Sequence, residues 1–473
     1  MTIADLSSVS DYTGMKVTVM GLGTFGGGVA ATRFLAQRGA VVTVTDLRPE
    51  VELQDSLQQL DDVPIAGIFA GAHPDTAFTG TQLLVVNPAV KPGNVIVEQF
   101  RNRGAIITSE IGLFLHHNPA SVVAVTGSNG KSTTAALTCQ LLEQHVAAHG
   151  NSVWLGGNIG HSLLPSLTDI QSDDIVVLEL SSFQLYALAS SGFAPRVGVV
   201  TNFSPNHLDW HPTLEHYRTA KQIMLRRQGQ HDVAVLPPDL NDAADGWRVR
   251  GQCLRFGTSD DGEDGAFLEH GSLILRRGHI EDAVRINQPS QLPGAHNGRN
   301  IAAAACAAWS MGADVNHFDA ALAKYEPLPH RLQLVADGRG LRFYNDSLAT
   351  TPESAIAALR SFSTPCVIIA GGYDKGSDLR AFAEAIHAKT VAAVLIGDTA
   401  NSLAQHLSSL SSAEQQFHLA VAKDFEDAFS LAVAVAPQGS IVLLSPGCAS
   451  YDWFRDFRER GDRFRNLALQ WLQ

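Results

Sequence analysis

The sequence predicts an α/β protein of three domains: a Rossmann-like N-terminal domain, a central P-loop domain and a Rossmann-like C-terminal domain. Three observations predict this class. Short β-rich apolar runs alternate with helical segments along the chain, and two of these runs lead into glycine-rich loops. The length of 473 residues also suits about three domains. Strands and helices that alternate in this way form parallel sheets covered by helices on both faces.

The first predicted domain spans residues 1–118. A β-rich run enters a glycine loop, and the segment after the loop has the apolar spacing of a helix. The elements expected here are strands at 16–20, 41–46, 82–86 and 105–108, and helices at 29–39 and 94–103. This order is typical of a nucleotide-binding fold.

The other two predicted domains span residues 119–327 and 328–473. In the second, we expect strands at 121–126, 174–180 and 197–201, helices at 132–145, 214–227 and 300–311, and hairpins or loops at 260–278. In the third, we expect strands at 341–345, 366–370, 392–397 and 440–445, with helices between them.

The composition excludes several classes of protein. The formal charge is −13, which argues against a nucleic-acid binder built on a general basic face. No apolar run reaches the ~18 residues of a membrane span, and residues 1–13 lack the features of a secretory signal. The five cysteines are dispersed, as expected of free thiols in a reducing compartment. We expect a cytoplasmic monomer whose partners are small molecules, with no nucleic-acid or membrane partner.

Residues 21–26 spell Gly-Leu-Gly-Thr-Phe-Gly, the G-x-G-x-x-G pattern, between the first strand and the first helix. Such glycines allow a tight turn and a close approach of phosphate to the helix N-terminus. Asp46 ends the next strand, where an acid can bind a ribose hydroxyl, and Arg48 is placed to contact a phosphate or a base. We expect a nucleotide-type ligand here. The alternative is a glycine turn that only packs against the helix.

The strongest local signal is the run Thr126-Gly-Ser-Asn-Gly-Lys-Ser-Thr133, again between a strand and a helix. In such a loop the backbone amides cradle phosphates, the lysine reaches the outer phosphates and the next hydroxyl binds Mg²⁺. It departs from the usual P-loop at Val125, which occupies the first glycine position. We therefore expect a central P-loop ATPase domain, in which ATP is bound by Gly127, Ser128, Asn129, Gly130, Lys131, Ser132 and Thr133.

Other predicted strands also end in polar side chains. Glu179 ends a buried strand, where it either holds Mg²⁺ or caps the next helix. His207 follows the strand at 197–201, and Lys221 lies on the predicted helix at 214–227. Judged by residue type alone, His207 is more often structural than a ligand, and Lys221 is an ordinary solvated charge.

Several polar runs lie at or near the ends of later elements. Asn297 fits the N-cap of the alanine-rich helix, and asparagine amides also bind an adenine edge. In open α/β sheets, ligands bind at the strand ends where the third domain carries its polar runs. These runs are Pro329-His-Arg331, Asn345-Asp-Ser347, Gly371-Gly-Tyr-Asp-Lys375 and Ser445-Pro-Gly-Cys-Ala-Ser450. Singly, each is also explained as a cap, a turn or a solvated charge.

Taken in order, these segments resemble the Mur ligase family across nearly the whole chain. The resemblance is carried by residues 126–133, 156–160 (Gly-Gly-Asn-Ile-Gly), 178–185 (Leu-Glu-Leu-Ser-Ser-Phe-Gln-Leu), 206–209 with 217–221, 296–297 with 300, 329–331, 345–347, 444–450 and 454–461. Within the family, the Ser-Ser-Phe-Gln-Leu and Ser-Pro-x-Cys-Ala-Ser runs are most similar to the member that adds D-glutamate.

The resemblance implies an ATP-dependent amide ligase. The reaction it implies adds D-glutamate to UDP-N-acetylmuramoyl-L-alanine through an acyl phosphate, in cytoplasmic peptidoglycan precursor synthesis. The cofactors it implies are ATP and two Mg²⁺ ions. The first domain would hold the uridine diphosphate end of the substrate, the second would hold ATP, and the third would bind the amino acid and close over ATP.

The resemblance also implies roles for single residues. The catalytic set would be Lys131, Glu179, His207 and Lys221. Ser132 would serve the first Mg²⁺, and the second would be held by Glu179, His207 and Lys221 in carbamylated form. Beyond the phosphate loop, ATP would contact Asn297, Asn300, Arg331 and Asp346. The UDP-linked substrate would contact Gly23, Thr24, Asp46, Arg48, Asn87 and Asn158. The amino acid would lie against Thr350, Lys375, Ser450 and Phe457.

One departure from the family concerns the amino-acid pocket. The family's Asp-Ser-Lys-Ala-Thr run reads Asp346-Ser-Leu-Ala-Thr350 here, so Leu348 replaces a lysine. L-glutamate therefore stays open as an alternative to D-glutamate. A folylpolyglutamate synthase-like ligase would keep the chemistry but lacks a comparable N-terminal domain. A nicotinamide-dependent dehydrogenase or a non-catalytic nucleotide sensor would explain residues 21–46 but not the phosphate loop.

Overall fold

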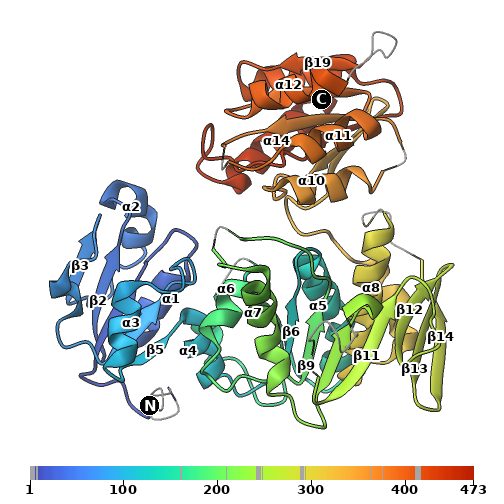
Figure 1. Ribbon diagram of the computed structural model, residues 1–473. Helices are drawn as coiled ribbons and strands as arrows, with labels where there is room; N and C mark the ends of the chain where they lie inside the picture. The colour runs from blue at the N-terminus through green and yellow to red at the C-terminus, as the bar shows by residue number, and fades with distance from the viewer. Residues whose placement is uncertain are drawn as a thin grey trace. The chain divides into compact units, whose positions relative to one another are not determined.

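The computed structural model describes residues 6, 9–159, 162–208, 210–240, 247, 249–287, 292, 294–362, 364–374, 376–410 and 417–473. The backbone divides into two compact units, residues 1–286 with 299–321 and residues 287–298 with 322–473. The first unit contains two sheets and the second contains one (Figure 1). Strands that pair mostly in parallel alternate with helices in both units, which confirms the predicted α/β class.

The first sheet has five parallel strands in the order β3-β2-β1-β4-β5. Its strands are β1 (Lys16–Met20), β2 (Val41–Asp46), β3 (Gly67–Ala70), β4 (Leu83–Val86) and β5 (Ile106–Thr108). The helices of this region are α1 (Gly27–Gln37), α2 (Glu50–Gln58), α3 (Val95–Asn102) and α4 (Glu110–His117). The strand order reverses beside β1, and ligands of open α/β sheets bind at such a reversal.

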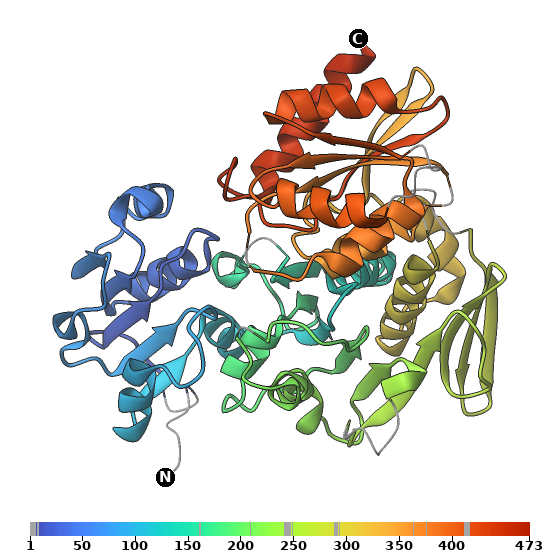
Figure 2. The ribbon, with the colours of Figure 1, turned by 45° about the horizontal axis from the view of Figure 1, so that its top comes forward.

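The second sheet has nine strands in the order β14-β13-β12-β11-β10-β9-β6-β8-β7. They are β6 (Ser121–Thr126), β7 (Val153–Gly157), β8 (Ile175–Glu179), β9 (Val197–Val200), β10 (Val233–Leu236), β11 (Gln252–Gly257), β12 (Gly265–Glu269), β13 (Ser272–Arg277) and β14 (Ile280–Arg285). The β12–β14 strands pair antiparallel and form one end of the sheet, as Figure 2 shows in yellow-green. The hairpin expected within 260–278 is thereby confirmed.

The helices along this part of the chain include the one that follows the phosphate loop. They are α5 (Lys131–Ala147), α6 (Ser182–Ala187), α7 (Leu214–Arg226), α8 (Ala295–Ser310) and α9 (Phe318–Ala323). The phosphate loop, residues 127–130, joins β6 to α5, and β6 lies between β8 and β9. Helix α8 begins at Ala295, so Asn297 lies in its first turn and the predicted N-cap is wrong.

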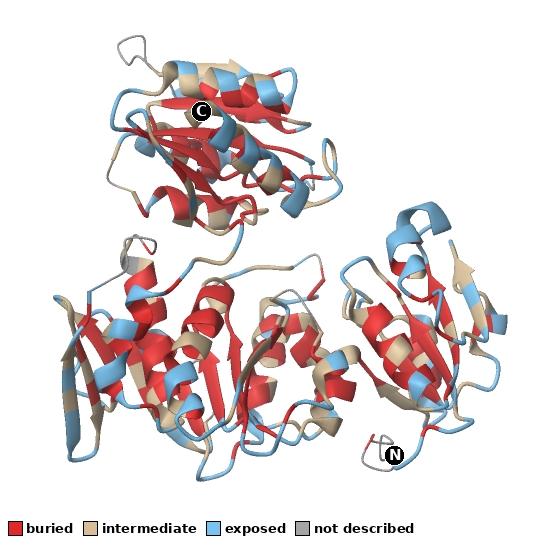
Figure 3. Ribbon diagram, turned by 180° about the vertical axis from the view of Figure 1, so that it is seen from behind, coloured by how far each residue is buried: buried red, intermediate tan, exposed pale blue. Residues whose placement is uncertain are grey.

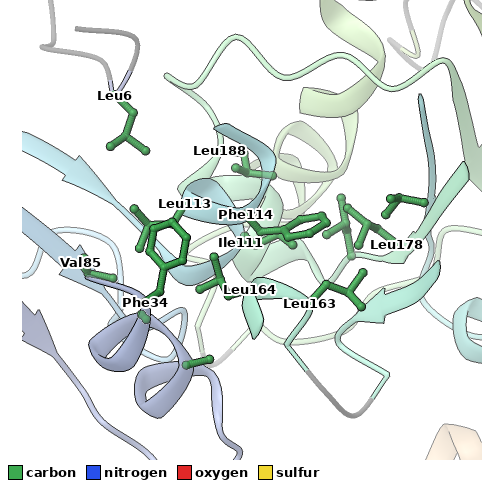
Figure 4. Packing of buried hydrophobic residues seen from close by; sticks show 14 of the residues in the cluster. Leu6, Phe34, Val85, Ile111, Leu113, Phe114, Leu163, Leu164, Leu178 and Leu188 are labelled. Carbon is green, nitrogen blue, oxygen red and sulfur yellow. The ribbon is translucent and has the colours of Figure 1, made fainter. Parts of the chain in front are cut away.

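A hydrophobic core joins the first two sheets within the first unit. Helix α4 supplies Ile111, Leu113 and Phe114, and Figure 4 shows them between Phe34 of α1 and the segment around Leu163. All of these side chains are buried, and burial of each large apolar side chain stabilises the fold by about 1.5–3 kcal/mol. The core fixes the first sheet against the second.

The third sheet, in the second unit, has six strands in the order β15-β16-β20-β17-β18-β19. They are β15 (Gln333–Gly338), β16 (Leu341–Asn345), β17 (Cys366–Gly371), β18 (Ala392–Ile396), β19 (His418–Val421) and β20 (Ile441–Leu444). The helices are α10 (Pro352–Leu359), α11 (Arg380–Lys389), α12 (Ala400–Leu410), α13 (Phe425–Val435) and α14 (Phe457–Leu472). Two apolar cores lie on its faces, and Figure 3 shows buried strands beneath helices with exposed outer sides. Among the residues with described structure, no helix has the length and apolar character that crossing a membrane requires.

Candidate active site

The phosphate loop is held in shape by the segment that follows β9. Asn129 N donates to Asn202 Oδ1 over 2.9 Å, and Asn202 Nδ2 donates to Asn129 O over 2.8 Å. Gly127 has φ +147°, and a Cβ there would lie 1.9 Å from Thr201 Oγ1. A side chain at Gly127 would therefore displace the neighbouring strand end, which explains the glycine.

The turn into α5 contains Lys131 and Asn300. Lys131 Nζ donates to Ser128 O over 3.0 Å, so the lysine folds along the loop. Gly130 has φ +80°, and a Cβ there would lie 2.4 Å from Asn300 Oδ1. Asn300, which we expected to contact ATP, therefore packs against the phosphate loop itself. The helix N-terminus at Lys131 provides the backbone dipole and amides that favour a bound phosphate.

Lys221 is not the solvated charge that its residue type suggests. It is 1% exposed, and its Nζ donates to Gly127 O over 2.7 Å. The Nζ also lies 4.6 Å from the ring centroid of Tyr217, one helical turn away. Burial, followed by the charge of Lys131, holds the pKa of Lys221 well below its usual value. The low pKa favours a neutral, nucleophilic amine at this position.

Glu179 ends β8 beside this lysine and is 2% exposed. Its Oε1 accepts a hydrogen bond from Asn158 Nδ2 over 3.1 Å, and Asn158 N donates to Glu179 O over 2.8 Å. Its Oε2 is buried and has no hydrogen-bond partner among the described residues. A buried carboxylate oxygen without a partner is costly unless it binds a cation. Glu179 therefore suits a metal site better than a helix cap, which the Ser181 side chain already provides for α6.

His207 lies in the segment between β9 and α7, with φ +55°. Its ring is 4.9 Å from that of Phe183 and 6.2 Å from that of Tyr217, measured between centroids. The Tyr217 hydroxyl lies 3.1 Å from Ser128 Oγ, so this tyrosine joins the His207 segment, Lys221 and the phosphate loop. Tyr217 was not among the predicted site residues.

Within the described part of the chain, which does not include Asp209, no three His, Cys, Asp or Glu side chains form a cluster that could hold a metal. The predicted ligands Glu179 and His207 therefore need a further donor. The unpartnered Glu179 Oε2 fits a hard cation such as Mg²⁺, and a carboxylate added to Lys221 would supply more oxygen. The residues present are compatible with the predicted metal.

The glycine loop of the first sheet is closed by Asp46. One carboxylate oxygen accepts from Gly23 N over 2.8 Å and the other from Arg48 N over 2.9 Å. Arg48 Nη1 donates to Thr24 Oγ1 over 3.2 Å, so all four predicted residues lie together. Both Asp46 oxygens already hold the backbone, which gives this acid a structural role in addition to the predicted ribose contact.

Asn87, after β4, lies against the same glycine loop. Its Nδ2 donates to Gly21 O over 3.1 Å, and a Cβ at Gly21 would lie 2.6 Å from the Asn87 Cβ. The ends of β1, β2 and β4 thus bring the predicted UDP residues to one edge of the first sheet. Asn158 lies elsewhere in the same unit, beside Glu179.

Asp346, after β16 in the second unit, is fully buried. Its Oδ2 accepts from Ser445 Oγ over 2.7 Å and its Oδ1 from Leu332 N over 3.1 Å. Burial raises the pKa of Asp346 to about 7, although these hydrogen bonds and the charge of Arg331 oppose the rise. Asp346 and Arg331, two of the predicted ATP residues of this unit, therefore interact electrostatically.

The predicted amino-acid residues follow the same strand ends. Thr350 follows β16, Ser450 follows β20, and Phe457 begins α14, while Lys375 lies outside the described residues. Ser347 Oγ donates to Phe457 O over 2.7 Å, which connects two of these segments.

Arg460 is a residue of this region that the sequence analysis missed. It is fully buried, and its guanidinium donates to Ser347 Oγ over 3.0 Å, to Cys448 O over 3.1 Å and to Ala449 O over 3.1 Å. Burial lowers the pKa of Arg460 to about 10. Arg460 therefore joins the loops after β16 and β20.

Comparison with known families decides the class of protein. Residues 15–109 match the model of the Mur ligase MurD-like N-terminal domain, residues 125–308 match the Mur ligase middle domain, and residues 330–448 match the Mur ligase glutamate ligase domain. The chain belongs to the Mur ligase family. The predicted architecture of three domains with a middle ATP-binding domain is confirmed, as is the expected class of ATP-dependent ligase.

Curated Mur ligases align along the full chain. A UDP-N-acetylmuramoylalanine–D-glutamate ligase of Pelotomaculum thermopropionicum is 37% identical, covering 98% of this chain and 99% of the relative. A ligase of the same name from a Roseiflexus species is also 37% identical, covering 96% and 98%.

Solved Mur ligases share the fold. A UDP-N-acetylmuramate–alanine ligase from Thermotoga maritima superposes with a TM-score of 0.60 at 19% identity, covering 96% of this chain and 99% of the other. A MurF ligase from Thermotoga maritima in complex with ADP superposes with a TM-score of 0.54 at 19% identity, covering 84% and 91%.

Proposed function

We propose that this Mur ligase joins D-glutamate to the carboxyl group of UDP-N-acetylmuramoyl-L-alanine at the expense of ATP, in cytoplasmic peptidoglycan precursor synthesis. The observation that carries the proposal is the buried Lys221 amine, which is bound to the phosphate loop and interacts electrostatically with Glu179, whose Oε2 is buried without a partner among the described residues. The full-length similarity to ligases with this name supports the choice of substrates.

The chemistry begins with activation of a carboxylate, which is a poor acceptor because oxide is a poor leaving group. A carboxylate oxygen attacks the γ-phosphorus of ATP, the bond to the β–γ bridging oxygen breaks, and ADP leaves. The amine of glutamate then adds to the acyl carbon and loses a proton. The tetrahedral intermediate expels phosphate, which carries away the oxygen that made the attack. An amide, ADP and phosphate are the products.

The middle domain supplies the charge stabilisation for phosphoryl transfer. Lys131 and the N-terminal amides of α5 would stabilise the negative charge that gathers on the phosphoryl oxygens. The two hydrogen bonds between Asn129 and Asn202 hold the phosphate loop in place before ATP binds, so little reorganisation accompanies the reaction. Asn297, Asn300, Arg331 and Asp346 complete the proposed ATP site.

We assign two Mg²⁺ ions to this site: Ser132 serves the first, and Glu179, His207 and carbamylated Lys221 serve the second. Bound Mg²⁺ neutralises phosphate charge and orients the reacting oxygens. Lys221 is suited to carbamylation because burial lowers its pKa and so favours the neutral amine, the form that adds to CO₂, releases one proton and leaves a carboxylate. That carboxylate would relieve the shortage of oxygen donors beside Glu179.

The other two sites follow from the strand ends. Residues 1–118 bind the uridine diphosphate end through Gly23, Thr24, Asp46, Arg48 and Asn87, and Asn158 contacts the same substrate from the middle domain, residues 119–327. Residues 328–473 bind the amino acid through Thr350, Lys375, Ser450 and Phe457. We expect the enzyme to act as a cytoplasmic monomer.

Leu348 occupies the position where the family has a lysine in the amino-acid pocket. The configuration of the glutamate substrate therefore needs its own test. Phosphate release with UDP-N-acetylmuramoyl-L-alanine, run in parallel with D- and L-glutamate, tests it. The proposal predicts release with D-glutamate alone. Release with L-glutamate alone would assign the alternative substrate, and release with neither would overturn the proposed reaction.

A further inference from the structure

A half-buried acid, Glu110, connects the first two domains outside the groups that the proposed reaction uses. It is the first residue of α4, where Ser109 provides the N-cap. Its Oε1 accepts a hydrogen bond from the hydroxyl of Ser162, and that hydroxyl accepts one from Leu164 N over 3.1 Å. The Ser162 hydroxyl is therefore oriented from both sides, with its single proton directed at Glu110.

Glu110 lies between the two segments that the proposed UDP-linked substrate would contact. On one side, a Cβ at Gly27 would lie 3.8 Å from the Glu110 Cγ, and Gly27 begins α1 directly after the 21–26 loop. On the other side, Ser162 follows Asn158 by four positions. Asn158 itself is held by two hydrogen bonds to Glu179. Asn158 and Ser162 are thus each held by a different acid.

A purely structural role accounts poorly for this acid. The apolar side chains around α4, such as Ile111 and Leu163, already join the two sheets (Figure 4). A carboxyl group placed at the edge of such a core has a desolvation penalty that an apolar residue would avoid. Burial also raises the pKa of Glu110 above its ordinary value, which reflects that penalty. Glu110 is therefore better explained as a residue that positions Ser162 than as one that stabilises the fold.

We propose that Glu110 is a positioning residue for the UDP-linked substrate. By holding Ser162, four positions after Asn158, it fixes this residue of the middle domain relative to the 21–26 loop, so that one rigid substrate meets the two domains at a fixed separation. The inference rests on the proposed function, because it assigns Asn158 and the 21–26 loop to the same ligand. It concerns this substrate only, since Glu110 contacts none of the residues proposed for ATP in the described structure.

The test measures binding of UDP-N-acetylmuramoyl-L-alanine and, separately, of ADP by calorimetry. Glu110→Ala and Ser162→Ala should each raise the Kd for the UDP-linked substrate about tenfold, since each leaves a polar group without its partner. The Kd for ADP should change less than about twofold. The double variant should bind no worse than either single variant, because both remove one interaction. Glu110→Gln keeps an acceptor for the Ser162 hydroxyl and should restore most of the lost affinity.

Ile111→Val is the matched control on the same helix. It trims the shared core by one methylene and should lower the melting temperature without changing either Kd. An equal rise in both Kd values, additive losses in the double variant, or an unchanged Kd for the UDP-linked substrate in Glu110→Ala would overturn the inference. A wild-type protein that binds ADP but not the UDP-linked substrate would instead overturn the proposed function, and the inference with it.

Discussion

Lys221 Nζ donates a hydrogen bond to the carbonyl oxygen of Gly127 over 2.7 Å, so a buried lysine is bound to the backbone of the phosphate loop. Burial at this position lowers the pKa of the lysine and so favours its neutral amine over the charged form. The proposed activity depends on this hydrogen bond. It connects the loop that binds phosphate to the lysine that is proposed to hold Mg²⁺ in carbamylated form.

Replacement of Lys221 should abolish ligation without unfolding the enzyme. Lys221→Ala removes the proposed carbamate, and we expect kcat to fall about 100-fold or more. High bicarbonate should not restore the variant, whereas wild-type activity should fall when CO₂ and bicarbonate are removed and return when they are added. Thr219→Ala, on the same helix, is the control and should keep full activity. Full activity of Lys221→Ala would remove this lysine from the mechanism.

The phosphate loop should not accept a side chain at Gly130. Gly130 and Gly150 have nearly equal φ values, +80° and +77°, but only Gly130 has a neighbour, Asn300 Oδ1, in the space of a Cβ. Gly150→Ala should destabilise the protein by about 1 kcal/mol, which is the strain of the left-handed backbone alone. Gly130→Ala should lose more stability and raise the KM for ATP at least tenfold. If Gly130→Ala and Gly150→Ala had the same free energy of unfolding in urea and the same KM for ATP, the close contact between Gly130 and Asn300 would be contradicted.

Asp346 should make stability depend on pH in a defined window. Its pKa in the folded state, about 7, exceeds its ordinary value of 3.8, so the folded protein holds a proton that the unfolded chain has lost between these two values. The stabilising contribution of the protonated acid is therefore present at low pH and is lost as pH rises toward 7. Asp346→Asn lacks this titration.

Urea unfolding at several pH values measures the effect. The difference in free energy of unfolding between Asp346→Asn and the wild type should shift in favour of the variant from pH 4 to pH 7, and then stay level. A difference that does not change with pH would show that the carboxyl group is not perturbed.

Arg460 should be required for the fold of the second unit and for the amino-acid site. Arg460→Ala leaves several buried oxygens without a donor, and we expect a loss of about 2–4 kcal/mol in the free energy of unfolding. Because the loops that carry Ser347 and Ser450 would separate, the KM for glutamate should rise more than that for ATP. The control is Arg465→Ala, which removes an exposed ion pair with Asp462 and should change stability by less than about 0.5 kcal/mol.

Several elements could be predicted from the sequence because their signal is local. Strand β6 has the predicted bounds, 121–126, since a short β-rich apolar run between polar segments has one interpretation. Helix α4 was not expected. Four consecutive residues of this short helix, 111–114, are buried, so it lacks the polar face on which the helical pattern depends. Helix α4 packs between two sheets that are distant along the chain, and the local sequence does not show this packing.

The site residues divide in the same way. The glycines and Lys131 of the phosphate loop could be found because their spacing encodes a conformation. Lys221 was assigned only through the family resemblance, and Glu110 and Arg460 were not expected, because all three have the sequence context of surface charges. Their burial is created by elements that are distant along the chain: Lys221 by β6 and the phosphate loop, and Arg460 by the loops after β16 and β20. No local pattern records such contacts.

The central claim is that ATP activates the substrate carboxylate as an acyl phosphate. The most direct test measures the transfer of a carboxylate oxygen to phosphate. UDP-N-acetylmuramoyl-L-alanine labelled with ¹⁸O in its free carboxylate is incubated with ATP, Mg²⁺ and D-glutamate, and the released phosphate is analysed by mass spectrometry. An acyl phosphate intermediate requires one labelled oxygen in each phosphate for every amide formed. When both carboxylate oxygens are labelled, the second one stays in the amide carbonyl, so label in the amide is expected in every case. Phosphate without label would contradict activation of the carboxylate by ATP.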